Sequence, residues 1–254
     1  MSLAIGALAL FLVIGTPIAA AFALAVFLNA ERLNVWLDSL SSIPYDSVSS
    51  FALVAIPLFI LVGEIMNVSG MAASLATLAD RMIGRIRGAF GYIMIVASAF
   101  LGAITGSSVA TVAAIGSTFG PEMRARGYPA GYTAALNAAS GLLGVLIPPS
   151  IPLIIYGSTV GVSITELFAA TIVPGLLLAC SFVAVHRFRS RRVLAGGQET
   201  AVTGEGGVPA LASRASASKA VASAFLPVLV LGGIYGGFFT PTEAAAAACI
   251  YAIA

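Results

Sequence analysis

Hydrophobic residues fill most of the chain in long runs, and the polar residues that interrupt them mark the predicted elements. The apolar segments cover residues 2–29, 50–69, 89–120, 128–160, 165–186 and 222–238, and a last run begins at Thr242. A transmembrane α-helix needs about 20 predominantly apolar residues, and most of these segments reach that length. The pattern therefore predicts an all-α polytopic membrane protein.

The apolar stretch over residues 89–121 is interrupted at its centre by the sequence TGSS at residues 105–108. Its arms, 90–104 and 109–119, have 15 and 11 residues and reach about 22 and 16 Å as helices at 1.5 Å per residue. The hydrocarbon core of a bilayer is about 30 Å thick, so neither arm crosses it. We expect a re-entrant helical hairpin here; the alternative is a pair of short, tilted, buried helices.

Basic residues constrain how these segments cross the membrane. They form three clusters, at residues 81–87, 124–126 and 187–192. Basic residues concentrate in cytoplasmic loops, so we expect all three clusters on the same side. The stretch between the first two must then cross an even number of times, and its short arms favour a hairpin that enters and leaves on that side.

A second interruption lies in the next segment, where Pro148 and Pro149 fall inside the 33 residues of 128–160. Proline lacks a backbone donor and clashes with the preceding helical turn, so the pattern predicts two half-helices. Carbonyl groups where one half-helix ends coordinate a hard cation, and N–H groups where the next begins favour a carboxylate. A proline kink with no ligand is the alternative. Three hydroxyls can add to either kind of site: Ser107, Ser108 and Ser150.

The remaining pattern divides the chain into segments. We expect N-terminal membrane helices over 1–70, an interfacial amphipathic helix over 71–88, the hairpin over 89–121, the broken helix and a following transmembrane helix over 128–186, a cytoplasmic loop over 187–221 and a last membrane segment over 222–254. The interfacial helix is predicted by apolar residues at helical spacing with charged residues between them. The run from Thr242 has only 13 residues, so we expect the chain to be incomplete.

Composition supports the membrane class and excludes others. The chain has 254 residues, of which 59% are hydrophobic and 9% charged, with a mean hydropathy of +1.05. A net charge of +2 leaves no basic surface large enough to bind nucleic acid. With one histidine and no catalytic triad, phosphate loop or metal-ligand cluster, we expect neither an enzyme nor a cofactor. Glu243 closes a Thr-Pro-Thr-Glu capping box that begins at Thr240, so we interpret it as structural.

Two long runs carry a resemblance to a known family: AITGSSVATVAAIG at residues 103–116 and GVLIPPSIP at residues 144–152. They resemble the large membrane subunit of tripartite ATP-independent periplasmic (TRAP) transporters. Two further stretches support it, AIPLFILVGE at residues 55–64 and GGIYGGFFTPTEA at residues 232–244. The likeness covers essentially the whole chain except the loop at 187–220.

The resemblance implies an elevator-type secondary transporter, of which the chain holds the first inverted repeat and, over 222–254, the start of the second. It implies sodium-coupled import of organic anions, C4-dicarboxylates or similar carboxylates, across the bacterial inner membrane. A periplasmic substrate-binding protein and a small membrane subunit would be its partners, and Na⁺ its coupling ion with no other metal. Two alternatives remain, a sodium- or proton-coupled dicarboxylate transporter without a binding protein, and a non-transporting membrane assembly subunit.

The resemblance also implies which positions form the sites. The residues expected to bind sodium lie at the hairpin tip and the helix break: Gly106, Ser107, Ser108, Gly144 and Pro148. The residues expected to bind substrate lie beside them: Ser108, Thr111, Pro149 and Ser150.

Overall fold

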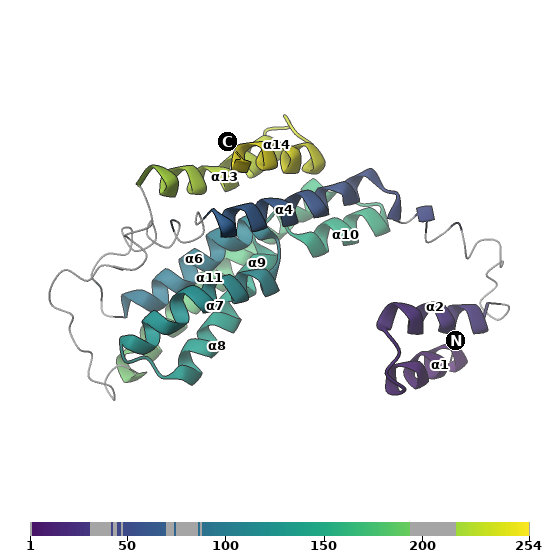
Figure 1. The fold of residues 1–254 in the computed structure, drawn as a ribbon, viewed down its shortest axis with the longest axis horizontal. Helices are drawn as coiled ribbons and strands as arrows, with labels where there is room; N and C mark the ends of the chain where they lie inside the picture. The colour runs from purple at the N-terminus through teal and green to yellow at the C-terminus, as the bar shows by residue number, and fades with distance from the viewer. Residues whose placement is uncertain are drawn as a thin grey trace. The chain divides into compact units, whose positions relative to one another are not determined.

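A computed structural model of the chain describes residues 2–30, 48–69, 88–193 and 217–253, together with residues 42, 45, 46, 74 and 86. Every regular element in these residues is a helix (Figure 1), which confirms the all-α prediction for the part described. The chain forms two compact units, Met1–Ser50 and Phe51–Ala254. The helices in order are α1 Ser2–Val13, α2 Ile18–Leu28, the 3₁₀ helix η1 Phe51–Val54, α4 Ala55–Val68, α6 Ala89–Thr105, α7 Ser108–Ala125, α8 Ala130–Gly141, α9 Leu143–Leu146, α10 Ile151–Val160, α11 Ile164–Val193, α13 Ala217–Tyr235 and α14 Pro241–Ile253.

The first unit contains two short helices that pack on each other, α1 and α2. They are separated at Gly15, which has a φ of 85°, and at Pro17, which precedes the first residue of α2. With 12 and 11 residues they reach about 18 and 16 Å, so the apolar run at 2–29 does not form one spanning helix. The interfacial helix predicted over 71–88 lies outside the described residues, apart from residues 74, 86 and 88.

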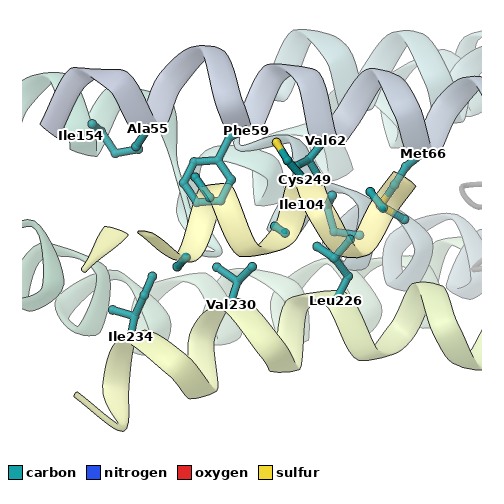
Figure 2. Close-up of a cluster of buried hydrophobic side chains, with 14 of the residues drawn as sticks. Ala55, Phe59, Val62, Met66, Ile104, Ile154, Leu226, Val230, Ile234 and Cys249 are labelled. Atoms are coloured by element: carbon teal, nitrogen blue, oxygen red, sulfur yellow. The ribbon is translucent and has the colours of Figure 1, made fainter. Parts of the chain in front are cut away.

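Two hydrophobic cores hold the second unit together. In the first, α14 lies against α4 and α13 (Figure 2), and buried alanines at 244, 245 and 248 allow α14 to approach α4 closely. Side chains spaced three or four residues apart line the facing sides of the larger helices. They are Ala55, Phe59, Val62 and Met66 on α4, with Leu226, Val230 and Ile234 on α13.

The second core lies among α6, α7, α8, α9 and α11. The buried side chain of His186 lies at the end of this core where α6 and α8 begin. His186 Nε2 lies 2.9 Å from the carbonyl oxygen of Gly88, and its Nδ1 lies 2.6 Å from the hydroxyl of Tyr132. Arg126 lies 3.5 Å above the centre of the Phe90 ring. The start of α6, the end of α7, the start of α8 and the end of α11 therefore share one end, where the second and third basic clusters also lie. The side of the membrane that this end faces stays a prediction.

The helices extend beyond the apolar runs that predicted them. The arm predicted to end at residue 119 continues as α7 through Pro121 to Ala125, and α11 continues to Val193, so a loop from residue 187 was wrong. α13 also begins at Ala217 rather than at residue 222. Arginine, glutamate, methionine and alanine are good helix formers, so a helix continues after its apolar residues end. Two described segments are long and apolar enough to cross a membrane, Ala130–Val160 and Ile164–Ser190.

Candidate functional site

The hairpin tip is a two-residue turn between α6 and α7. Gly106 ends α6 with a φ of 59°, and its N–H donates to the carbonyl oxygen of Gly102 over 2.9 Å. A left-handed residue at this position is the usual way to end a helix, and glycine adopts it without strain. Ser107 then begins α7 as its N-cap, with its Oγ accepting from the N–H of Ala110 at 3.4 Å. The interruption is where the sequence predicted it, and the re-entry of this hairpin into a membrane stays a prediction.

The break after the hairpin is also where the prolines predicted it. α9 ends at Leu146, and the N–H of Ile147 donates to the carbonyl oxygen of Leu143 over 2.9 Å. Pro148 and Pro149, joined by a cis peptide bond, follow in non-helical backbone. Ser150 occupies the N-cap position of α10. The second arm of the broken segment therefore starts afresh at Ile151, although Pro152 in its first turn has no N–H group.

The two interruptions meet. The N–H of Ile151, in the first turn of α10, donates to the carbonyl oxygen of Gly106 over 3.1 Å. A Cβ atom on Gly106 would lie 2.8 Å from the carbonyl oxygen of Pro149, and one on Gly144 would lie 3.0 Å from the carbonyl oxygen of Ser107. The ends of α6 and α9 and the starts of α7 and α10 are thus gathered at one place.

Glycine on both sides makes this approach possible. A Cβ atom on Gly102 would overlap the backbone of Gly144, and one on Gly144 would lie 2.7 Å from the hydroxyl oxygen of Thr111. Real Cβ atoms essentially never approach other atoms so closely, so α6 and the α8–α9 segment touch through their backbones. The hairpin tip is held against the break by this contact.

Threonine hydroxyls order the tip. Thr111 Oγ1 donates to the carbonyl oxygen of Ser107 over 2.8 Å and lies 3.2 Å from Thr105 Oγ1. The N–H of Ser107 donates to Thr105 Oγ1 over 3.4 Å. Both threonines are buried. The sequence reasoning missed Thr105, although it stands directly before Gly106 in the interruption that was singled out.

The hydroxyl of Ser150 is buried at the site without a hydrogen-bond partner among the described residues. The Ser150 side chain is 0% exposed. A buried polar group left without a partner costs about 1–3 kcal/mol. A ligand that bonds this oxygen would remove that cost, so the position fits a residue that contacts an ion or a polar group of a substrate.

The structure brings together six of the predicted site residues: Gly106, Ser107, Thr111, Gly144, Pro149 and Ser150. Ser108 opens α7 beside them, and its carbonyl oxygen would lie 3.4 Å from a Cβ atom on Gly141 of α8. Pro148 is buried in the break, and no direct contact joins it to the tip in the described contacts. Its inclusion in a sodium site stays a prediction.

The chemistry of the site is that of neutral oxygens and helix ends. Among the described residues, no three His, Cys, Asp or Glu side chains gather to hold a metal ion. Two helix ends present carbonyl groups, whose partial negative charge favours a cation. The start of α7 presents N–H groups, whose partial positive charge favours an anion, and the start of α10 presents fewer, because Pro152 has no N–H. The arrangement can therefore hold a cation and an anionic group side by side.

Known proteins are similar to this chain over nearly its whole length. Residues 5–254 match the family model described as the DctM component of the tripartite ATP-independent periplasmic transporter. The isethionate TRAP transporter permease protein DctMQ of Oleidesulfovibrio alaskensis is 41% identical over 251 residues, which cover 98% of this chain and 38% of that protein.

Two other relatives extend the comparison. The 2,3-diketo-L-gulonate TRAP transporter large permease protein YiaN of Escherichia coli is 35% identical, over 94% of this chain and 55% of that protein. The C4-dicarboxylate TRAP transporter large permease protein DctM of Pseudomonas aeruginosa is 39% identical, over 82% of this chain and 47% of that protein. The chain spans about half the length of the curated relatives it matches, and the substrates in their names differ.

Proposed function

The chain belongs to the family of DctM components, the large permeases of tripartite ATP-independent periplasmic transporters, and from this premise we propose that it carries one half of the transport machinery of a sodium-coupled importer. It is a transporter component and not an enzyme. In this proposal a periplasmic binding protein delivers an organic anion, a small membrane subunit completes the permease, and the assembly works by an elevator mechanism in the bacterial inner membrane.

The meeting of four helix ends at Gly106 and Ile151 supports this proposal. In an apolar bilayer a helix end is tolerated only where protein or a water-lined cavity surrounds it, and Ser150 adds a buried hydroxyl without a partner. Broken helices with ends facing one another are how secondary transporters bind ions and anionic substrates. A kink without a ligand would leave the buried Ser150 hydroxyl without a hydrogen-bond partner.

Each set of helix ends has a proposed role. The carbonyl ends of α6 and α9 coordinate Na⁺, and each carbonyl oxygen has two lone pairs, so the bond from Ile151 leaves Gly106 one more. The N–H groups at the start of α7 attract the anionic group of the substrate. The start of α10 adds less, because Pro152 has no N–H and that of Ile151 is bonded to Gly106. The proposed sodium residues are Gly106, Ser107, Ser108, Gly144 and Pro148, and the proposed substrate residues are Ser108, Thr111, Pro149 and Ser150.

This arrangement gives a physical basis for coupling. Sodium bound at the carbonyl ends adds positive charge beside the anion site, and Gly106 and Ile151 already join the two by one hydrogen bond. Each ligand then raises the affinity for the other by the same factor, as linkage requires. The substrate is proposed only as an organic anion, with C4-dicarboxylates as one candidate, because the relatives' named substrates differ.

The test is uptake by the full-length permease reconstituted in vesicles with its small subunit. With an inward sodium gradient and the periplasmic protein present, the labelled anion should accumulate, and removing either one should abolish uptake. Uptake that persists without the periplasmic protein would instead support a dicarboxylate transporter of the related class. Uptake indifferent to sodium would contradict the proposal.

A further inference from the structure

The interface between α7 and α8 has a regular register that predicts a third contact. A Cβ atom on Gly141 would overlap the side chain of Val112, and one on Gly116 would overlap the amide nitrogen of Asn137. Moving four residues forward on α7 thus moves four residues back on α8, as expected for antiparallel helices. One more step places Gly120 opposite Thr133.

At this third position, beside Gly120, α7 and α8 are not in close contact. Gly120 is buried, yet a Cβ atom added there would meet nothing within 4 Å. At the other two positions of the register the same test finds an overlap. A gap large enough for a methyl group therefore lies inside the interface beside Gly120, on the side that faces α8.

The α8 side of this gap carries polar atoms without partners. Thr133, Asn137 and Ser140 are 6%, 9% and 0% exposed, and their Oγ1, Oδ1 and Oγ atoms lack hydrogen bonds among the described residues. Their spacing of four and three residues puts them on one face of the helix. The amide of Asn137 is oriented by its Nδ2, which donates to the carbonyl oxygen of Val112 over 2.9 Å, so its unpaired atom is the oxygen.

A fourth such atom comes from α6. Gly102 lies against Gly144, and both helices run from the basic end toward the break, so Ser98 lies at the height of Ser140, four residues earlier on each. Ser98 is 0% exposed, and its Oγ also has no partner in the part of the chain described. Of these four unpaired oxygens, that of Thr133 is the one whose register position faces the open space beside Gly120.

We propose that an ordered water molecule occupies the gap beside Gly120, bonded to Thr133 Oγ1. Native proteins rarely leave buried polar atoms unpaired, and internal water fills a site that is both polar and roomy enough. The hydroxyl of Thr133 donates and accepts, as water does. The proposal does not depend on the function proposed above.

The test is a double-mutant cycle on the melting temperature of the full-length protein in detergent. Thr133→Val keeps the shape of the side chain and removes only the hydroxyl. Gly120→Ala fills the gap without a clash. If water is present, Thr133→Val lowers the melting temperature, and Gly120→Ala raises it more in the Thr133→Val background than in the wild-type background, because there it displaces no bonded water.

A gap without water predicts different changes in the melting temperature. Thr133→Val would then raise the melting temperature by removing an unpaired hydroxyl, and Gly120→Ala would raise it equally in both backgrounds. This pattern of results would overturn the proposal.

Discussion

The backbone N–H of Ile151 donates a hydrogen bond to the carbonyl oxygen of Gly106 over 3.1 Å, and this bond joins the two interruptions of the chain. It links the first turn of α10 to the tip of the hairpin formed by α6 and α7. A cation-attracting helix end and an anion-attracting helix start are thereby neighbours.

Substitution of Gly144 should separate the hairpin from the break. In Gly144→Ala the new methyl group would lie 2.7 Å from Thr111 Oγ1 and 3.0 Å from the carbonyl oxygen of Ser107. Overpacking a close contact of this kind costs about 1–3 kcal/mol. We therefore expect a lower melting temperature of the detergent-solubilised protein and a loss of uptake in vesicles.

Gly232→Ala is the matched control for this variant. Gly232 lies inside α13, and a Cβ atom there meets nothing within 4 Å. Alanine is favoured over glycine in a helix by about 1 kcal/mol, so this control should melt at or above the wild-type temperature. Equal stability of the Gly144 and Gly232 variants would mean that the backbone contact at Gly144 is not close.

The contact between Tyr132 and His186 should stabilise the basic end of the bundle. The Gly88 carbonyl oxygen can only accept, so in neutral His186 the Nε2–H donates to it and Nδ1 accepts from the Tyr132 hydroxyl. Tyr132→Phe leaves that buried nitrogen without its donor, at a cost of about 1–2 kcal/mol. A lower melting temperature is expected.

Tyr156→Phe provides the comparison, because the Tyr156 side chain on α10 is 53% exposed. The loss of its hydroxyl should change the free energy of unfolding by less than about 0.5 kcal/mol. If both phenylalanine variants melt together, the hydrogen bond to His186 contributes nothing to stability.

Glu243 should be needed for the start of α14 and not for proton transfer. The carboxylate oxygen Oε2 accepts from the N–H of Thr240 at 2.8 Å and from its hydroxyl at 2.9 Å, and the N–H of Glu243 donates to Thr240 Oγ1 over 3.3 Å. These bonds confirm the predicted capping box. Glutamine preserves the acceptor, so Glu243→Gln should retain uptake and stability, while Glu243→Ala should melt earlier. Loss of uptake in Glu243→Gln alone would assign it a role in proton transfer.

The interruptions could be predicted from the sequence because their causes are local. Gly106 supplies a left-handed residue, Ser107 a cap and Pro148 a missing donor, and each of these effects depends on one or two residues only. The hydroxyl of Ser150 beside the prolines was likewise visible as a candidate ligand. Family resemblance then extended the candidate set to Gly144 and Thr111.

The registers between helices could not be predicted in the same way. Nothing in the spacing of Gly102 and Gly144 shows that their backbones touch, because that contact depends on how α6 crosses the α8–α9 segment. The hydrogen bonds that join His186 to Gly88 and Tyr132 also depend on how the helices pack, because these residues are far apart in the sequence. Helix ends were misjudged for another reason, since hydropathy marks the part of a helix that avoids water and not the helix itself.

The sodium dependence of uptake tests the proposed site most directly. The measurement is the sodium concentration for half-maximal uptake by the reconstituted full-length permease, in Ser107→Ala, in Ser108→Ala and in the control Ser158→Ala. The Ser158 hydroxyl donates to the carbonyl oxygen of Ile155 within α10. Melting temperatures without sodium monitor the loss of the cap at Ser107.

Loss of one sodium ligand should raise the half-maximal sodium concentration by up to about tenfold, which corresponds to about 1.4 kcal/mol. We expect that increase in Ser107→Ala and Ser108→Ala and an unchanged value in Ser158→Ala. If all three variants are activated by sodium as the wild type is, the hairpin tip is not the sodium site.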